Sequence, residues 1–155
     1  MKALAIVLIF IAGSAHAAFG SKPAAFDYSI FTGHFVPVAP CQMQPIDLVP
    51  DEAHSEVKLM LQNNWSYDPF GFINKGKIKF DTCFSDGNLG YSETVGKGNT
   101  ITTTRVSKRP GILCMGGLEK NRYTVVLQLT NTGFTYSTKN SGESFKVCEF
   151  SKTGN

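Results

Sequence analysis

Hydrophobic and polar positions alternate along short stretches of this chain, and Asn, Asp and Gly residues separate one stretch from the next. The clearest alternation runs through 122–130, where every odd-numbered position is apolar. A period of two places successive side chains on opposite faces of an extended strand. The same signals predict further strands at 70–73, 77–84, 89–95, 100–106, 112–115, 134–139 and 145–151.

The first half of the chain is less regular. A strand is predicted over 27–38, and Pro37 marks its end because proline cannot donate a ladder hydrogen bond. Further prolines make the segment 40–50 irregular. Residues 56–62 alternate and favour a strand, although a helix that begins at Asp51 also accommodates their apolar positions.

Tight turns between consecutive strands make sequence neighbours antiparallel. About eight strands in this order predict an all-β fold, an antiparallel up-and-down barrel or sandwich. Closure into a barrel is the simpler solution because it removes the exposed sheet edges. The candidate core residues are large apolar side chains of the predicted strands: Phe31 or Phe35, Phe72, Phe80, Tyr123, Leu127, Phe134 and Val147.

The N-terminus has the three-part pattern of a secretory signal peptide. Lys2 supplies a positive charge, 3–12 form an apolar run, and a small-residue Ala-x-Ala sequence ends at Ala17. Cleavage is expected after Ala17, since a membrane span needs about 20 apolar residues and this run is much shorter. We therefore expect a mature protein outside the cytoplasm, in the periplasm or secreted. The chain divides into the signal peptide at 1–17, a flexible lead-in at 18–27 and one domain at 28–155.

Removal of the signal peptide changes the composition that matters for folding. The mature part contains 13 Thr, 11 Phe and 5 Tyr, but only 5 Ala and 8 Leu. Thr and aromatic residues favour strands, whereas Ala and Leu favour helices. The mature part keeps 14 basic and 12 acidic residues, a net charge of +2, which argues against a nucleic-acid partner.

All four cysteines belong to the mature part. An even number of cysteines in an exported chain predicts disulfides, and no C-x-x-C spacing indicates a zinc cluster or a redox pair. In a closed meander the first and last strands are neighbours, which favours Cys41–Cys148 and leaves Cys83–Cys114. The alternative pairing, Cys41–Cys83 with Cys114–Cys148, stays open.

One segment resembles a known family. In the stretch 30–38, Gly33 is followed two residues later by Phe35, which resembles the first-strand motif of lipocalin-like (calycin) barrels. That family carries Trp where this chain has Phe35. The resemblance implies an eight-stranded barrel that holds an apolar ligand in its mouth, and it carries over no ligand-binding residue.

Few groups are available for catalysis, because only His34 and His54 remain after cleavage. His54 stands in the acidic stretch 51–56, which offers oxygen and nitrogen atoms, but metal sites need three or four ligands in a fixed geometry. A solvated loop is the preferred interpretation, so we predict no metal and no cofactor. No serine lies in a G-x-S-x-G elbow, and a small hydrolase is the least supported function.

Two groups of residues are candidate binding surfaces. The basic group surrounds one predicted hairpin and would attract an anionic partner if the two ends of that hairpin lie together. Its members are Lys97, Arg105, Lys108 and Arg109. The aromatic group is Trp65, Tyr67, Phe70 and Phe72, of which Trp65 and Tyr67 are the candidate binding residues because they offer rigid apolar area with a polar end. A solvated sheet edge and packing at a barrel end are the respective alternatives.

These observations predict an exported, non-enzymatic binding protein. It would hold a small apolar ligand, or an envelope lipid or polymer, in or on a small β-barrel. The alternative is an inhibitor or protein-interaction module that presents 108–111 or the Trp65 loop to a secreted protease or lysozyme.

Overall fold

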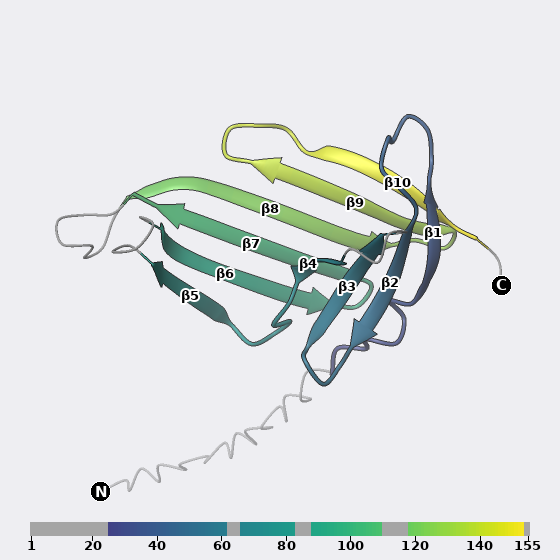
Figure 1. Cartoon of the computed structure of the whole chain (residues 1–155), viewed down its shortest axis with the longest axis horizontal. Coiled ribbons are helices and arrows are strands. Elements are labelled where there is room, and N and C mark those ends of the chain that lie inside the picture. Colours follow the sequence, from purple (N-terminus) through teal and green to yellow (C-terminus); the bar gives the residue numbers. More distant parts are fainter. Residues whose placement is uncertain (1–24, 62–65, 83–87, 110–117, 154–155) are drawn as a thin grey trace, which may run out of the picture.

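The computed structural model describes residues 25–61, 66–82, 88–109 and 118–153, and the regular elements of this part are all β-strands (Figure 1). In chain order they are β1 (Gly33–Pro37), β2 (Ile46–Asp51), β3 (Glu56–Leu61), β4 (Ser66–Phe70), β5 (Lys77–Thr82), β6 (Asn88–Lys97), β7 (Thr100–Lys108), β8 (Glu119–Leu129), β9 (Gly133–Asn140) and β10 (Lys146–Lys152). The predicted all-β, antiparallel fold is confirmed, with ten strands in place of about eight. Among the described residues, no helix is long and apolar enough to cross a membrane.

The strands form one antiparallel sheet in the order β4-β3-β2-β1-β10-β9-β8-β7-β6-β5. Consecutive strands pair except β4 with β5, and β1 pairs with β10, so the first and last strands are neighbours as in a closed meander. The sheet curls until β4 lies over β7, where the Thr103 hydroxyl donates a hydrogen bond of 2.6 Å to the Pro69 carbonyl. In Figure 1, β2–β4 cross in front of β6–β8. The result is a half-barrel that leaves a seam between β4 and β5.

Alternate residues of these strands fill the inside of the curl. Five of the buried side chains are Phe, and the ring of Phe134 stacks on Phe150 at 4.4 Å and meets the edge of Phe35 at 4.9 Å. Each buried side chain of this size contributes roughly 1.5–3 kcal/mol. The core residues are Phe31, Phe35, Ile46, Leu48, Val57, Leu59, Phe70, Ile73, Ile101, Val125, Leu127, Phe134, Tyr136 and Phe150.

The predicted core is partly confirmed. Four of its members are buried: Phe31, Phe35, Leu127 and Phe134. Phe72 and Val147, however, are 57% and 59% exposed. Phe72 stands in a turn with a positive φ of 55°, and Val147 lies on the outer face because its neighbour Cys148 is opposite the buried Tyr136. Phe80 and Tyr123 are half-buried.

The observed strand boundaries differ most from the predicted ones in the first half of the chain. The strand predicted over 27–38 begins only at Gly33, because a turn precedes it in which the Phe31 N–H donates to the Tyr28 carbonyl. Strand β2 lies inside the segment expected to be irregular. The strand interpretation of 56–62 is confirmed by β3, and the helix alternative is wrong. The strand predicted at 112–115 lies outside the described residues.

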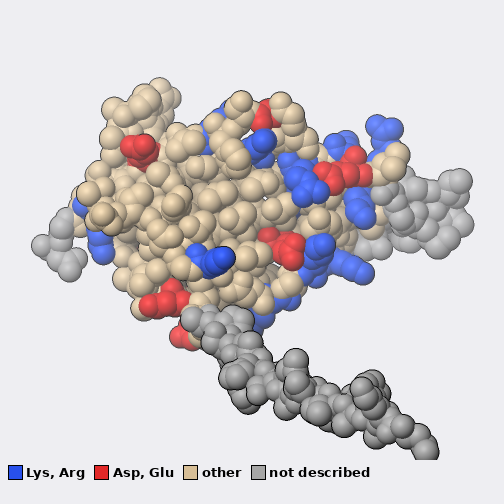
Figure 2. Space-filling view, turned by 180° about the vertical axis from the view of Figure 1, so that it is seen from behind, with Lys and Arg blue, Asp and Glu red and all other residues tan. Residues whose placement is uncertain are grey.

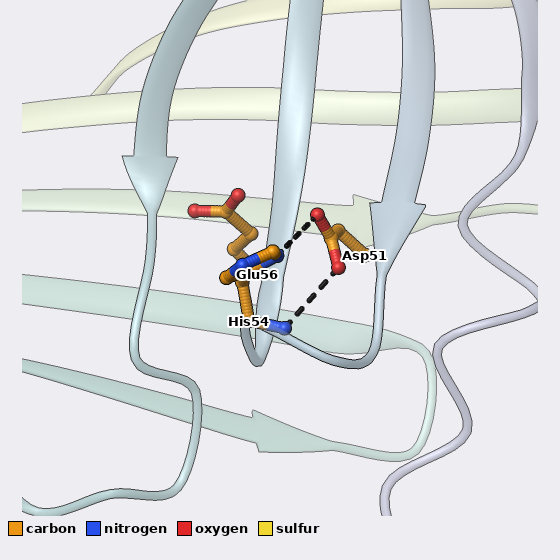
Figure 3. Close-up of side chains that lie close together, drawn as sticks. All are labelled: Asp51, His54 and Glu56. Carbon is orange, nitrogen blue, oxygen red and sulfur yellow. Dashed lines mark hydrogen bonds and ion pairs between the residues drawn. The ribbon is translucent and has the colours of Figure 1, made fainter.

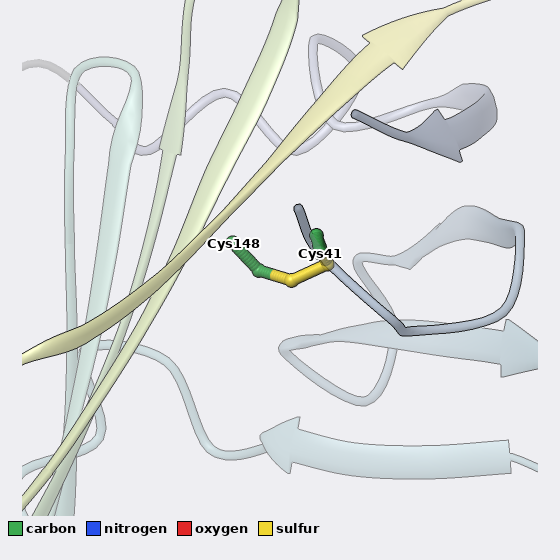
Figure 4. The surroundings of a disulfide bond; sticks show 2 residues. All are labelled: Cys41 and Cys148. Atoms are coloured by element: carbon green, nitrogen blue, oxygen red, sulfur yellow. A yellow bond between two sulfur atoms is a disulfide. The ribbon is translucent and has the colours of Figure 1, made fainter. Parts of the chain in front are cut away.

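A disulfide joins Cys41, in the loop after β1, to Cys148 on β10 (Figure 4). It closes a loop with a sequence separation of 107. The Val38 N–H also donates to the Glu149 carbonyl at 2.8 Å, so the same junction is held by backbone hydrogen bonding. The pairing expected from the meander is confirmed for this bridge, while Cys83 and Cys114 lie outside the described residues.

Candidate functional site

Basic side chains gather at one end of β5–β8, a surface that we call the basic end. It comprises Lys77, Lys79, Arg105, Lys108, Arg109, Lys120 and Arg122. The strand register brings two of them into one row across the sheet, which runs from Lys79 through Tyr91 and Val106 to Arg122, whereas Arg105 lies at the same end on the opposite face, over the Phe80 ring. At about 4.8 Å per strand, this row spans roughly 14 Å. Figure 2 shows the Lys and Arg side chains gathered at the right of the outer face.

Some of these cations have partners that fix their positions. The guanidinium of Arg122 donates two hydrogen bonds of 3.0 Å to the carboxylate of Glu119. This interaction lowers the pKa of Glu119 and raises the pKa of Arg122, mainly through the side-chain hydrogen bond. Two other cations lie over aromatic rings, Lys77 over Tyr91 and Arg105 over Phe80, each at 4.9 Å from the ring centre.

The basic end carries a large excess of positive charge. Counting described side chains, seven cations face two nearby acids, Glu93 and Glu119, which leaves +5 where the whole chain has +3. Four of the cations make neither an ion pair nor a cation–π contact with a described residue: Lys79, Lys108, Arg109 and Lys120. Cations within one or two Debye lengths of each other, about 8 Å each at physiological salt, attract an anionic partner together.

The hairpin predicted to join the basic residues does not join all of them. Lys97 pairs with Thr100 at the β6–β7 turn, whereas Arg105, Lys108 and Arg109 lie at the other end of β7. The two ends of the hairpin are apart because β6 and β7 are long, at 10 and 9 residues. Sequence reasoning missed the four remaining cations, although the alternation of Lys77 and Lys79 was a usable signal of one strand face.

The aromatic candidate binding residues lie only partly within the described part of the structure. Tyr67 lies on β4 opposite Leu59, and Trp65 and the side chain of Tyr67 lie outside the described part of the structure. The neighbouring Phe70 is buried in the core. Residues 110–117 are also outside the described part, so loop presentation to a protease or lysozyme stays a prediction.

The acidic stretch forms a network at the tip of the β2–β3 hairpin (Figure 3). His54 Nδ1 lies 2.7 Å from Asp51, and the His54 backbone N–H donates to the same carboxylate. These two bonds, the side-chain bond first, lower the pKa of Asp51. The ligand atoms of Asp51, His54 and Glu56 lie within 4.8 Å of one another. The ammonium of Lys58, 2.8 Å from Glu56 and 3.6 Å from Asp51, supplies a cation at this cluster.

The two histidines of the described part occupy separate pairs. His34 on β1 lies beside Asp47 on β2, with its Nδ1 2.5 Å from a carboxylate oxygen, and both side chains are exposed. His54 belongs to the hairpin network at the far end of β2. No described hydroxyl group hydrogen-bonds to either ring, so neither pair forms a nucleophile–base–acid arrangement among these residues.

A groove of about 670 Å³ opens on the outside of the molecule, next to the segment that precedes β1. Its lining includes the side chains of Phe26, Ile30 and Val95, and the last two are 42% and 48% exposed. Lys97 stands at the same groove. The inside of the curl, by contrast, is packed with the core side chains.

No protein-family model, curated protein or solved structure matches this chain.

Proposed function

We propose that the mature chain is an exported, non-enzymatic binding protein that attaches to an anionic component of its compartment through the basic end. The observation that carries this proposal is the concentration of seven cations from β5, β7, β8 and the residue after β7, with Glu93 and Glu119 as the acids beside them among the described side chains. Arginine and lysine on a rigid sheet bind carboxylate or phosphate groups without first being ordered, which lowers the entropic cost of binding.

Export is supported by two independent features. The N-terminal residues have the pattern of a signal peptide, and the Cys41–Cys148 disulfide suits an oxidising compartment. An anionic partner in such a compartment would be a carboxylated or phosphorylated surface component. Salt should weaken the interaction, because exposed charges are screened.

The test compares two double variants with equal net charge. Lys79→Glu with Lys120→Glu reverses two cations of the basic end that pair with no described residue, whereas Lys75→Glu with Lys97→Glu reverses two exposed lysines elsewhere. Binding of the mature chain to polyglutamate and to anionic vesicles is measured by sedimentation at low and physiological salt. We expect the first variant to lose binding and the second to retain it. Equal loss in both variants would mean that net charge alone drives binding.

A second candidate function is the binding of an apolar ligand in the external groove. The groove has the volume of a small-molecule site and an apolar lining that includes Phe26, Ile30 and Val95. Native mass spectrometry of the mature chain from its source compartment would detect a bound lipid. Val95→Asp should abolish this binding, while Val147→Asp, on a similarly exposed valine elsewhere, should leave it unchanged.

A further inference from the structure

Strand β5 is a free edge of the curled sheet. Among the described residues it lies last in the strand order and pairs with β6 alone, while the other terminal strand, β4, is covered by its contact with β7. A free edge presents a row of backbone donors and acceptors to any extended chain that can lie beside it.

Hydrogen bonds beside β6 identify these residues. The N–H and C=O of Gly96 bond to the side chain of Asn74, and the Thr94 carbonyl accepts the Asn74 N–H, at 2.9–3.1 Å. Asn74 lies just before β5, so even-numbered residues of β6 direct their backbone groups toward β5. Backbone direction alternates along a strand.

The register then assigns the outward groups of β5. Ile78 pairs with Ser92 and Phe80 with Gly90, both even-numbered residues of β6, so Ile78 and Phe80 bond inward. The backbone N–H and C=O of Lys77 and Lys79 therefore point away from the sheet. No described residue outside β6 forms a backbone hydrogen bond with them.

The side chains beside this edge have two distinct chemistries. Lys77 and Lys79 are exposed on the outer face. Ile78, 38% exposed, and the half-buried Phe80 lie on the opposite face, where Arg105 covers the Phe80 ring at 4.9 Å. A strand added here would meet Lys77 and Lys79 on one face, and on the other face Ile78 and Phe80 with Arg105 over the Phe80 ring.

We propose that the β5 edge binds an extended, acidic segment of a partner protein as an eleventh strand of the sheet. The segment would alternate acidic residues, opposite Lys77 and Lys79, with apolar residues beside Ile78. This inference rests on the proposed function and names its partner as a polypeptide. A second copy of the same edge is disfavoured, because the lysines of the two copies would lie opposite one another on one face.

The experiment uses a synthetic peptide in which Glu alternates with Val, and the mature chain with its disulfides intact. Controls are a peptide of the same composition with Glu and Val in separate blocks, and the alternating peptide with N-methyl groups on alternate amides. On the protein, Lys79→Pro removes the outward N–H and the charge, while Lys79→Gln removes the charge alone. Proline is tolerated at edge positions whose N–H faces solvent, so Lys79→Pro should fold.

We expect the alternating peptide to bind about tenfold more weakly to Lys79→Pro than to Lys79→Gln, because one intermolecular hydrogen bond is lost. Alternate amides can be N-methylated in two ways, and only the set that faces β5 should weaken binding of the peptide to the wild type. This comparison tests strand addition if Lys79→Pro fails to fold. Equal binding of both variants, or of block and alternating peptides, would overturn strand addition but leave the proposed anionic binding intact. Absence of binding to both peptides and to polyglutamate would overturn both proposals. Wild-type dimers that are lost in Lys79→Pro would assign the edge to a second copy instead.

Discussion

The ring of Phe26 lies directly on Gly96, so close that a Cβ at this glycine would come within 2.6 Å of two ring carbons. The side chain of Asn74 holds the same glycine through its backbone N–H and C=O. The contact fastens the segment before β1 to β6 at the external groove. The groove wall therefore depends on the absence of a side chain at one strand position.

Gly96→Ala should destabilise the fold by about 1–3 kcal/mol, since the added methyl group overlaps Phe26 and also comes within 2.8 Å of Ile73. Gly71→Ala is the matched control, because the nearest atom to its new Cβ, on Glu56, would be 3.9 Å away. Urea denaturation of both variants measures the difference. Similar midpoints for the two would contradict the close packing of Phe26.

Truncation of two residues that the sequence predicted as core should change the free energy of unfolding by very different amounts. Phe134→Ala removes a ring that contacts Phe35 and Phe150, and we expect a loss of about 3–5 kcal/mol. Val147→Ala should change stability by less than about 0.5 kcal/mol, because Val147 is 59% exposed. Denaturant titrations of the two variants under identical conditions test the assignment of sheet faces. A large effect of Val147→Ala would show that the outer face is covered.

Loss of the Cys41–Cys148 bridge should be costly because it closes a long loop. Replacing both cysteines by Ser should lower the free energy of unfolding by about 3–5 kcal/mol in the chain-entropy model. Guanidinium denaturation under non-reducing conditions measures the loss. Peptide mapping of the wild type under the same conditions tests the remaining prediction, Cys83–Cys114, and two free thiols at these positions would contradict it.

The hairpin network predicts a pH dependence of stability. The pKa of Asp51 is lowered in the folded state from its ordinary value of 3.8, mainly by the His54 side chain. The carboxylate therefore stabilises the fold above pH 3.8, and this contribution is lost as the pH falls through the lower, folded-state pKa. The melting temperature of Asp51→Asn should lie below the wild-type value at pH 7, and the difference should shrink below pH 3.8.

His54→Ala is the companion variant for this measurement. It removes the side-chain hydrogen bond but keeps the backbone N–H that also bonds Asp51. We expect it to reproduce part of the Asp51→Asn effect at pH 7. A difference between wild type and Asp51→Asn that stays constant from pH 7 to pH 3 would contradict the assigned cause.

Much of the fold was predictable because alternation and turn residues are local signals. These signals located the described strands from residue 77 onward within a few residues. The first and last strands of a meander are adjacent, and this favoured Cys148, the correct partner of Cys41. Strand β2 was missed because Pro45 before it and Pro50 within it are typical of an irregular segment. Pro50 lies near the end of β2, opposite Val57 of β3 and beyond the residues of β2 that pair with β1, so no β1 partner is lost there.

The basic end was less accessible from sequence. Lys79 and Arg122 are far apart in the chain, and only the pairing of β5, β6, β7 and β8 places them in one row. Lys97, close to Arg105 in sequence, lies at the opposite end of β7 for the same reason. The register of strand pairing decides which charged residues of different strands become neighbours, and this register cannot be read from a single sequence.

The sequence by itself determined the class of fold, since side-chain alternation, Thr and Phe content and Asn/Gly turns all act within a few residues. It also determined the expectation of export and of disulfides. Tertiary structure decided which face of each strand is buried, where the sheet stops pairing, and which cations share a surface. These depend on contacts between distant segments: the curl that places β4 over β7 also leaves β5 as the free edge, with Lys77 and Lys79 directed away from the sheet.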